Sequence, residues 1–345
     1  MKHWLLPEEG KFYKGNLHTH TTLSDGRFTP GEIKKLYSEK GYSVVAFTDH
    51  DIFLPHNDLT DGSFLALNSH EVEITEVFRG SGNFKRQYHL NFYAKRHDAE
   101  FSPVFSESRV WAPAAKERVT DEMRKTDIVG YYSTDSINTL IRIANENGFF
   151  VMYNHPVWSL QNYRDYTRLR GLWGIEVFNT GCVGSGLVDT VQPFVDLLRE
   201  GERLFPLCTD DTHGAGDLFG GWVQIRAKDL DYETVTGALV RGDFYSSTGP
   251  EIRELYIEDG NVHIETSEVR EILAISDWRF AKRIKAGEGG PISGAVIPVG
   301  GVEKKALELD HNGDDSFLRF EVVDNAGMKA YTRAYRISEL FPELF

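Results

Sequence analysis

Three short apolar runs in the first part of the chain each end in a cluster of histidine with aspartate or asparagine. The runs cover residues 43–47, 149–153 and 204–208, and they lead into Asp49-His50-Asp51, Asn154-His155-Pro156 and Asp210-Asp211-Thr212-His213. A stretch of helical periodicity precedes each run, so strands and helices alternate. This alternation is typical of β/α units that form a parallel sheet or barrel. In such folds the carboxyl ends of the strands carry the active site, so the polar clusters predict functional positions.

The helices that this pattern predicts have clear boundaries. They are expected over residues 30–40, 139–147 and 190–200, and a glycine follows each of them. Residues 101–136 have weak periodicity, several charges and two prolines. That composition favours an excursion or a lid over the site rather than a core element.

The hydrophobic pattern of the sequence changes after residue 249. Short alternating runs, typical of antiparallel strands, follow at residues 254–257, 262–265, 271–276, 306–309 and 317–323. Turn-forming residues stand at 259–261 and 310–315. We therefore expect two domains, a larger domain over residues 1–249 and a small antiparallel, β-sandwich-like domain over residues 250–345.

The net charge of the chain restricts its partners. The 345 residues include 52 acidic and 38 basic side chains, which give a formal net charge of -14. A field of this sign repels polyanions, so a stable nucleic-acid complex is not expected, whereas a small anion can still bind where cations dominate the local potential. Only Cys182 and Cys208 are present, and neither a signal peptide nor a long apolar segment is found. These features favour a cytoplasmic protein without membrane contact.

A His-Thr-His pair, His18 and His20, suggests a metal site. Side chains two residues apart on an extended segment point to the same side, so both imidazoles can reach one ion. Alone, the pair is better explained as two surface histidines on an edge strand. It is not alone, because Asp25 follows closely and Asp211 and His213 repeat the pattern far along the chain. Imidazole together with carboxylate suits Zn, Mn, Fe or Co rather than Ca or Mg.

Four further residues have the chemistry of metal ligands. His50 follows a strand, His155 precedes a proline, and His89 and Glu73 stand inside apolar strands. Burying even an uncharged polar group without a partner costs roughly 2–7 kcal/mol, and a nearby cation removes that cost. For His89 alone, a hydrogen-bonded core histidine is the better explanation.

Other acidic and histidine residues compete for these roles. Glu71 stands two residues from Glu73 on the same strand face. Asp49, Asp51 and Asp210 are interpreted as residues that orient imidazoles or cap turns. The remaining histidines are interpreted as surface or structural: His3, His56, His70, His97, His263 and His311.

Taken together, these motifs resemble those of the PHP family, named for polymerase and histidinol phosphatase. The matching segments, in the order of the family, are residues 16–26, 47–51 and 72–74, His89, residues 154–156 and residues 211–213. The resemblance covers about residues 14–249. With its added β domain the chain looks like the two-domain, predicted metal-dependent phosphoesterases of that family, including the carbaryl-hydrolase-like branch.

The resemblance implies a distorted (β/α)7 TIM-like barrel that holds two to three divalent ions, Zn, Mn or Fe. Carried over by position, the first ion would be held by His18, His20, Glu73 and Asp211. Glu73 would bridge to a second ion held by His89 and His155. The third ion would be held by Asp25, His50 and His213.

Such a cluster is typical of a metal-dependent hydrolase, most simply a phosphoesterase acting on a small phosphate mono- or diester. Water shared between two ions loses a proton near neutral pH and attacks, while the ions neutralise the developing charge. Protonation of the leaving group is open between His213, Asp210 and a metal-bound water, and Asp211 belongs to the same catalytic set. Cleavage of a carbamate, ester or amide by the same centre is the alternative, and a non-catalytic binding module is the third reading.

The residues after the His-Pro pair limit the prediction of the substrate. Family members that hydrolyse nucleotide phosphates resemble one another in having basic residues there, whereas this chain has Val-Trp-Ser-Leu at residues 157–160. The arginines that follow, Arg164, Arg168 and Arg170, either bind a phosphorylated small molecule or belong to a solvated surface. Trp158 and Tyr163 are candidates for an aromatic pocket wall.

Overall fold

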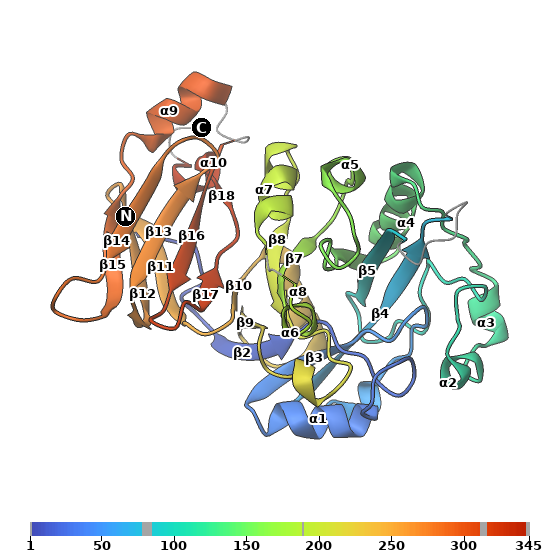
Figure 1. The fold of residues 1–345 in the computed structure, drawn as a ribbon. Coiled ribbons are helices and arrows are strands. Elements are labelled where there is room, and N and C mark those ends of the chain that lie inside the picture. Colours follow the sequence, from blue (N-terminus) through green and yellow to red (C-terminus); the bar gives the residue numbers. More distant parts are fainter. Residues whose placement is uncertain (1, 78–84, 188–189, 311–315, 343–345) are drawn as a thin grey trace. The chain divides into compact units, whose positions relative to one another are not determined.

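The computed structural model describes residues 2–77, 85–187, 190–310 and 316–342. Its contacts divide the chain into a larger unit, Lys11–Arg241, and a smaller unit made of Met1–Gly10 and Gly242–Phe345. Figure 1 labels most of the helices and strands of each unit. The expected boundary at residue 249 differs from this division, because the first strand of the chain and the strand after residue 241 both pair within the smaller unit.

The larger unit is built on a mixed sheet with the strand order β9-β2-β3-β4-β5-β6-β7-β8. Its strands are β2 (Lys11–Asn16), β3 (Tyr42–Phe47), β4 (Leu65–Thr75), β5 (Gln87–Ala94), β6 (Phe149–Tyr153), β7 (Gly174–Asn179), β8 (Phe205–Thr209) and β9 (Trp222–Ala227). The pairs β2–β3, β3–β4, β6–β7 and β7–β8 are parallel, whereas β5 is antiparallel to β4 and β6, and β9 is antiparallel to β2. The three apolar runs with polar ends are therefore confirmed as β3, β6 and β8.

The ladders of this sheet do not close into a barrel. In the described part of the chain the hydrogen-bonded path ends at β8, and a single parallel bridge between Thr19 and Thr212 joins the segments that follow β2 and β8. The antiparallel strand β5 also interrupts the run of parallel β/α units. The α/β architecture is confirmed, but the distorted (β/α)7 barrel is not.

The helices of the larger unit lie between these strands in the sequence. They are α1 (Pro30–Ser38), α2 (Pro113–Lys116), α3 (Asp121–Arg124), α4 (Thr134–Glu146), α5 (Tyr163–Tyr166), α6 (Thr180–Gly184), α7 (Gln192–Arg199) and α8 (Tyr232–Arg241), with short 3-10 turns η1 (Asn57–Leu59) and η2 (Ala215–Asp217). The three predicted helices are confirmed as α1, α4 and α7. Helix α4 begins earlier than predicted because the Ser133 side chain accepts a hydrogen bond from the Ser136 backbone and caps the first turn.

Helix α1 packs against the strands that lead to His50 and Glu71. A capping box from Thr29 and Glu32 begins the helix, and Pro30 occupies its first turn. Ile33 and Tyr37 are fully buried in one apolar cluster with side chains from β3 and β4. This packing holds the carboxyl end of β3, and with it His50, in a fixed place.

The predicted excursion, residues 101–136, has no strand in the structure and carries α2, α3 and the start of α4. A small apolar cluster that includes Ile52, Phe105 and Met123 packs it on the segment after β3. Arg109 joins the excursion to the segment after β3. Its Nε lies 2.9 Å from Asp51 Oδ1, and its Nη atoms donate to backbone carbonyls of the excursion. The excursion is therefore anchored beside the end of β3.

The smaller unit consists of two antiparallel sheets. One has the order β1-β11-β12-β15, and the other has the order β14-β13-β16-β17-β10 with β18 paired to β16. The strands are β1 (His3–Trp4), β10 (Phe244–Ser247), β11 (Ile252–Glu258), β12 (Asn261–Val269), β13 (Glu271–Ser276), β14 (Ala281–Lys285), β15 (Ile292–Pro298), β16 (Phe317–Val323), β17 (Lys329–Tyr331) and β18 (Tyr335–Arg336), followed by α10 (Ile337–Leu340). The predicted antiparallel β domain is consistent with this unit.

One predicted strand of this unit is wrong. Residues 306–309 lie in helix α9 (Val302–Asp310). Val302 and Ala306 are both buried, which is the spacing of one helix face, and Ala, Leu, Glu and Lys are strong helix formers. The rest of the predicted turn at 310–315, and His311 with it, lies outside the described residues.

No helix within the described ranges is long and apolar enough to cross a membrane.

Candidate metal centre

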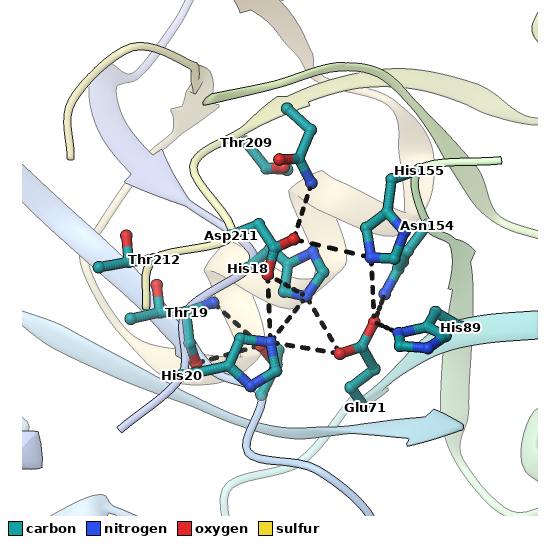
Figure 2. A network of polar contacts seen from close by, with 12 residues as sticks. His18, Thr19, His20, Glu71, His89, Asn154, His155, Thr209, Asp211 and Thr212 are labelled. Carbon is teal, nitrogen blue, oxygen red and sulfur yellow. Dashed lines mark hydrogen bonds and ion pairs between the residues drawn. The ribbon is translucent and has the colours of Figure 1, made fainter. Parts of the chain in front are cut away.

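The polar ends of the sheet strands meet at one place in the larger unit. His18 and His20 follow β2, Glu71 and His89 lie on β4 and β5, and the remaining members follow β6 and β8. Figure 2 shows His18, His20, His89, His155 and Asp211 around the Glu71 carboxylate. All six residues are buried, none of them more than 8% exposed. Such a concentration of buried imidazoles and carboxylates requires compensating charge.

Four atoms of this cluster are spaced like the ligands of one ion. His18 Nε2 and His20 Nε2 lie 3.2 Å apart, and each lies 3.2 Å from Asp211 Oδ1. Glu71 Oε2 lies 3.5 Å and 3.2 Å from the same two nitrogens. A tetrahedral ion with ligands at about 2.0–2.2 Å would separate its ligand atoms by about 3.3–3.6 Å. The donor set therefore fits a divalent cation such as Zn.

The structure corrects the predicted bridging carboxylate. Glu71, not Glu73, lies at the centre, with Oε1 3.0 Å from His89 Nδ1 and 3.5 Å from His155 Nε2. Glu73 comes no closer than 4.0 Å to His89, and its carboxylate accepts hydrogen bonds from Thr75 and Gln87 instead. Residues two apart on a strand share a face, so alternation alone could not separate the two positions.

The other predicted ligands are also brought together. Asp25 Oδ2 lies 3.2 Å from His213 Nε2 and 3.7 Å from His50 Nε2. His20 Nδ1 lies 3.4 Å from Asp25 Oδ1, which joins this group to the first one. The side chains of Asp25 and His213 are 34% and 38% exposed. This part of the cluster therefore faces the solvent.

Several buried atoms of the cluster have no hydrogen-bond partner. Among the described residues these include His50 Nδ1, His89 Nε2 and Asp211 Oδ1. Buried polar atoms are rarely left without a partner, and those that are need an explanation such as an ion. The three atoms belong to three different predicted ligands. They are a second observation, besides the spacing, that fits bound divalent cations.

The pKa shifts within the cluster also fit a site that binds cations. Burial opposes charge on His20, yet the neighbouring Asp211 and Glu71 carboxylates raise the pKa of His20 to about 10. Burial would also raise the pKa of Glu71, but the charges of His89 and His18 hold that pKa well below its usual value. The site thus stabilises positive charge, which protons supply in the metal-free protein and divalent ions supply when they displace those protons.

One buried carboxylate, Glu176 on β7, escaped the sequence analysis. Its Oε1 lies 2.6 Å from His18 Nδ1, and its Oε2 accepts the backbone hydrogen bond of His155 at 2.8 Å. A carboxylate on the far nitrogen of a ligating imidazole fixes its tautomer and orientation. The signal that singled out Glu73, an acidic residue inside an apolar strand, was present in Gly174–Asn179 as well.

Asp210 does not occupy the place predicted for a general acid. Its side chain accepts hydrogen bonds from the Tyr37 hydroxyl, the Thr180 hydroxyl and three successive backbone amides at residues 219–221. The next residue, Asp211, has a positive φ of 53°, so the two carboxylates point in different directions. Burial raises the pKa of Asp210, but its role is to hold the turn after β8.

Asp49 and Asp51 support the site from outside. Asp49 accepts hydrogen bonds from the backbone and hydroxyl of Thr21 and from the Ser24 hydroxyl, which fixes the loop that carries His20 and Asp25. Asp51 pairs with Arg109 and accepts a hydrogen bond from the Glu73 backbone. Neither residue lies at hydrogen-bond distance from a ligating atom among the contacts of the described residues.

A cavity of about 850 Å³, partly open to solvent, lies over the cluster. Two tryptophans line it from different segments. The Trp158 ring lies 5.3 Å from the His89 ring and 5.2 Å from the His155 ring, and the Trp111 ring lies 6.1 Å from the His50 ring. Trp111 belongs to the excursion over residues 101–136, so the part of the predicted lid that carries it borders the cavity.

The predicted phosphate-binding arginines do not line this cavity. Arg168 lies 3.8 Å from Asp135, and Arg170 lies 3.5 Å from Glu202 and donates to two backbone carbonyls. Arg164 is exposed outside the cavity. The described residues that line the cavity include no lysine and no arginine, and the exposed positions of the three arginines fit the alternative of a solvated surface.

Comparisons with known proteins give weak likenesses. No protein-family model and no curated protein matches the chain. A two-domain protein from Bacteroides vulgatus that contains a predicted PHP-like metal-dependent phosphoesterase is 15% identical, with a TM-score of 0.43 over 96% of this chain and 98% of that chain.

Two further solved structures are similar to parts of the chain. A proposed metal-dependent phosphoesterase from Bifidobacterium adolescentis is 17% identical, with a TM-score of 0.39 over 69% of this chain and 98% of that one. An amidohydrolase from Chromobacterium violaceum is 17% identical, with a TM-score of 0.39 over 59% of this chain and 88% of that one. At these values none of the likenesses establishes an activity, and the PHP family remains the one that the motifs of this sequence resemble.

Proposed function

We propose that this chain is a metal-dependent hydrolase that cleaves a small phosphate mono- or diester. The observation that carries the proposal is the Glu71 carboxylate, whose two oxygens face two different sets of imidazoles (Figure 2). A carboxylate in that position joins two adjacent cation sites. The motifs that resemble the PHP family support the same activity.

The proposed ligand sets follow from the contacts of the cluster. The first ion would be held by His18, His20, Glu71 and Asp211, the second by Glu71, His89 and His155, and the third by Asp25, His50 and His213. Divalent ions at such sites activate water for attack and neutralise the charge that develops on the reacting oxygens. The cofactors would be two to three ions of Zn, Mn or Fe.

The side chains around these sets position the ligands and the proton donor. Glu176 orients His18, and Asn154 donates a 2.6 Å hydrogen bond to Glu71 Oε1. Of the two protein groups predicted to protonate the leaving group, only His213 faces the cavity. Asp25 holds this imidazole through a 3.2 Å contact with Nε2.

Hydrolysis of a carboxylic ester or carbamate by the same centre is the second candidate function. The cavity offers no lysine or arginine among its described lining residues, and carboxylates line it instead. A substrate that carries at most one negative charge does not need a lysine or arginine in the cavity to neutralise a second charge. This observation favours neutral and singly charged esters over polyphosphates.

An activity panel tests both candidates. The protein, loaded in turn with Zn, Mn or Fe, is assayed on p-nitrophenyl phosphate, bis-p-nitrophenyl phosphate and p-nitrophenyl acetate, with metal content measured by mass spectrometry. Hydrolysis of either phosphate that depends on the metal supports the first candidate. Turnover of the acetate alone favours the second. Inactivity on all three with less than one bound metal ion per chain contradicts both.

A further inference from the structure

A second cavity opens beside the candidate metal centre. It is partly open to solvent, with about 330 Å³ of atom-free space that includes open solvent, and it shares His155, Trp158 and Cys182 with the larger cavity over the cluster. Its apolar walls come from the segment after β6, from β7 and from the segment that includes α6: Val157, Val177, Phe178, Val183 and Leu187. The two cavities therefore meet at a proposed ligand, His155.

The rim of this second cavity leaves large apolar side chains in contact with solvent. Val157 is 41% exposed, Trp158 is 44% exposed and Val183 is 38% exposed. Apolar side chains that remain exposed around a concave site are typical of ligand-binding surfaces. The cavity is thus a place where an apolar group would lose contact with water.

The larger cavity is more polar than the second one. Its described lining is rich in carboxylates and lacks lysine and arginine, so any part of a substrate beyond the reacting group has no cationic side chain to bind. Trp158 lies between the two cavities, with its ring against the rings of His89 and His155. A substituent on the reacting group would pass this ring and enter the apolar cavity.

We propose that the substrate is an ester whose reacting group carries an apolar substituent that occupies this second cavity. The inference rests on the proposed hydrolase function and names its substrate class. Each methylene placed in an apolar enzyme pocket changes kcat/KM by about 10–200-fold. A benzyl ester should therefore exceed the matching ethyl ester in kcat/KM by at least about tenfold.

The test compares benzyl and ethyl esters of one acid, because the two alcohols are leaving groups of similar acidity. The ester class is the one that the metal-loaded protein hydrolyses in the activity panel. Binding of benzylphosphonate and ethylphosphonate, which are not hydrolysed, is measured by calorimetry on the same protein. The benzyl compound is expected to be favoured by at least about tenfold in both measurements.

A matched pair of variants locates the preference. Val183→Phe fills the second cavity, whereas Val240→Phe makes the same change at a helical valine that is 39% exposed and lines neither cavity. Val183→Phe should reduce the benzyl-to-ethyl ratio to about one, and Val240→Phe should leave the wild-type ratio. Thermal melting of both variants checks that they are folded.

The possible results separate this inference from the proposed function. Equal kcat/KM and equal binding for the benzyl and ethyl compounds in the wild-type protein overturn the inference while leaving the hydrolase in place. A benzyl preference that survives in Val183→Phe overturns it as well. If no ester is hydrolysed, the proposed function fails, and the ratio of phosphonate affinities in wild type and Val183→Phe then decides the inference alone.

Discussion

The candidate metal centre has an inner and an outer part that differ in burial. The inner group consists of His18, His20, Glu71 and Asp211, and the outer group consists of Asp25, His50 and His213. The side chain of Asp211 is 12% exposed and the other three inner residues are at most 1% exposed, whereas the side chains of Asp25 and His213 are more than a third exposed. The inner group is therefore buried apart from the parts of Glu71 and Asp211 that line the cavity, and two members of the outer group contact solvent.

The two groups also differ in what holds their ligands. Buried side chains position the inner group: Glu176 bonds to His18, Asn154 to Glu71, and Asn179 to Asp211. In the outer group, Asp49 does not bond to Asp25 itself. It accepts hydrogen bonds from Thr21 and Ser24 in the loop that carries Asp25. A rigid, buried ligand set loses little freedom when an ion binds. We expect the inner group to retain its ion and the outer group to exchange it.

The largest expected effect comes from the carboxylate at the centre of the inner group. Glu71→Gln removes the charge that faces two sets of imidazoles, whereas Glu73→Gln makes the same change two residues along β4, where the side chain bonds to Thr75 and Gln87. Glu71→Gln should lower kcat/KM by more than about 100-fold, since loss of a residue that only supports a ligand costs 10–100-fold. Steady-state kinetics and metal content of both variants measure this.

The paired design distinguishes a ligand from a nearby charge. Glu73→Gln should keep its metal and lose less than about tenfold in kcat/KM, below the cost of a residue that supports a ligand. Equal losses in the two variants would mean that either carboxylate can serve, and a larger loss in Glu73→Gln would reverse the assignment of the bridging residue.

A smaller effect on metal affinity is expected for Glu176, which contacts the proposed ligand His18. Glu176→Gln keeps the size of the side chain but weakens its contact with His18 Nδ1. Such supporting residues contribute about 10–100-fold to metal affinity or activity. Competition with a fluorescent chelator measures the affinity of the inner site, and an unchanged value would show that the tautomer of His18 is fixed by other contacts.

The sequence allowed most of the centre to be predicted because its members follow strands. His50, His155 and Asp211 each stand directly after an apolar run that became β3, β6 or β8. Parallel strands bring their carboxyl ends to one edge of a sheet, so clustering followed from topology alone. Topology did not indicate which of two residues on the same strand face reaches the cluster. For this reason Glu73 was predicted at the place where Glu71 lies.

The remaining differences between expectation and structure have a similar physical origin. Arg168 was a candidate by its distance along the chain from His155, but α5 ends before it and the side chain lies near Asp135. Residues 306–309 alternate too briefly to distinguish a strand from a helix, and strong helix formers flank them. Closure of the sheet depends on pairing between distant strands, which local patterns do not encode.

The outer group should show a weaker dependence on its carboxylate. Asp25→Asn removes one charge from a group that is 34% exposed, so solvent already screens much of its attraction for a cation. We expect loss of one metal ion and a fall in kcat/KM of about tenfold, at the low end of the 10–100-fold range for metal-site support, with recovery when free metal is raised. Titration with a chelator should remove this ion before the inner one. Simultaneous loss of all ions would contradict the difference between the two groups.

The smallest effect concerns the metal-free protein and its pH dependence. The pKa of His20 is raised to about 10 by Asp211 and Glu71 against the opposing effect of burial, so its protonated form stabilises the folded state. That stabilisation is fully present below pH 6.5 and is lost as the pH rises towards 10. The metal-free protein should therefore melt several degrees lower at pH 9 than at pH 6.5, since about 1 kcal/mol shifts Tm by about 2–4 °C in a domain of this size.

The metal-loaded protein should lack this fall, because its ligating imidazoles are already deprotonated. Calorimetric melting curves of both forms across this pH range provide the measurement, and parallel curves would mean that the inner group holds no ion.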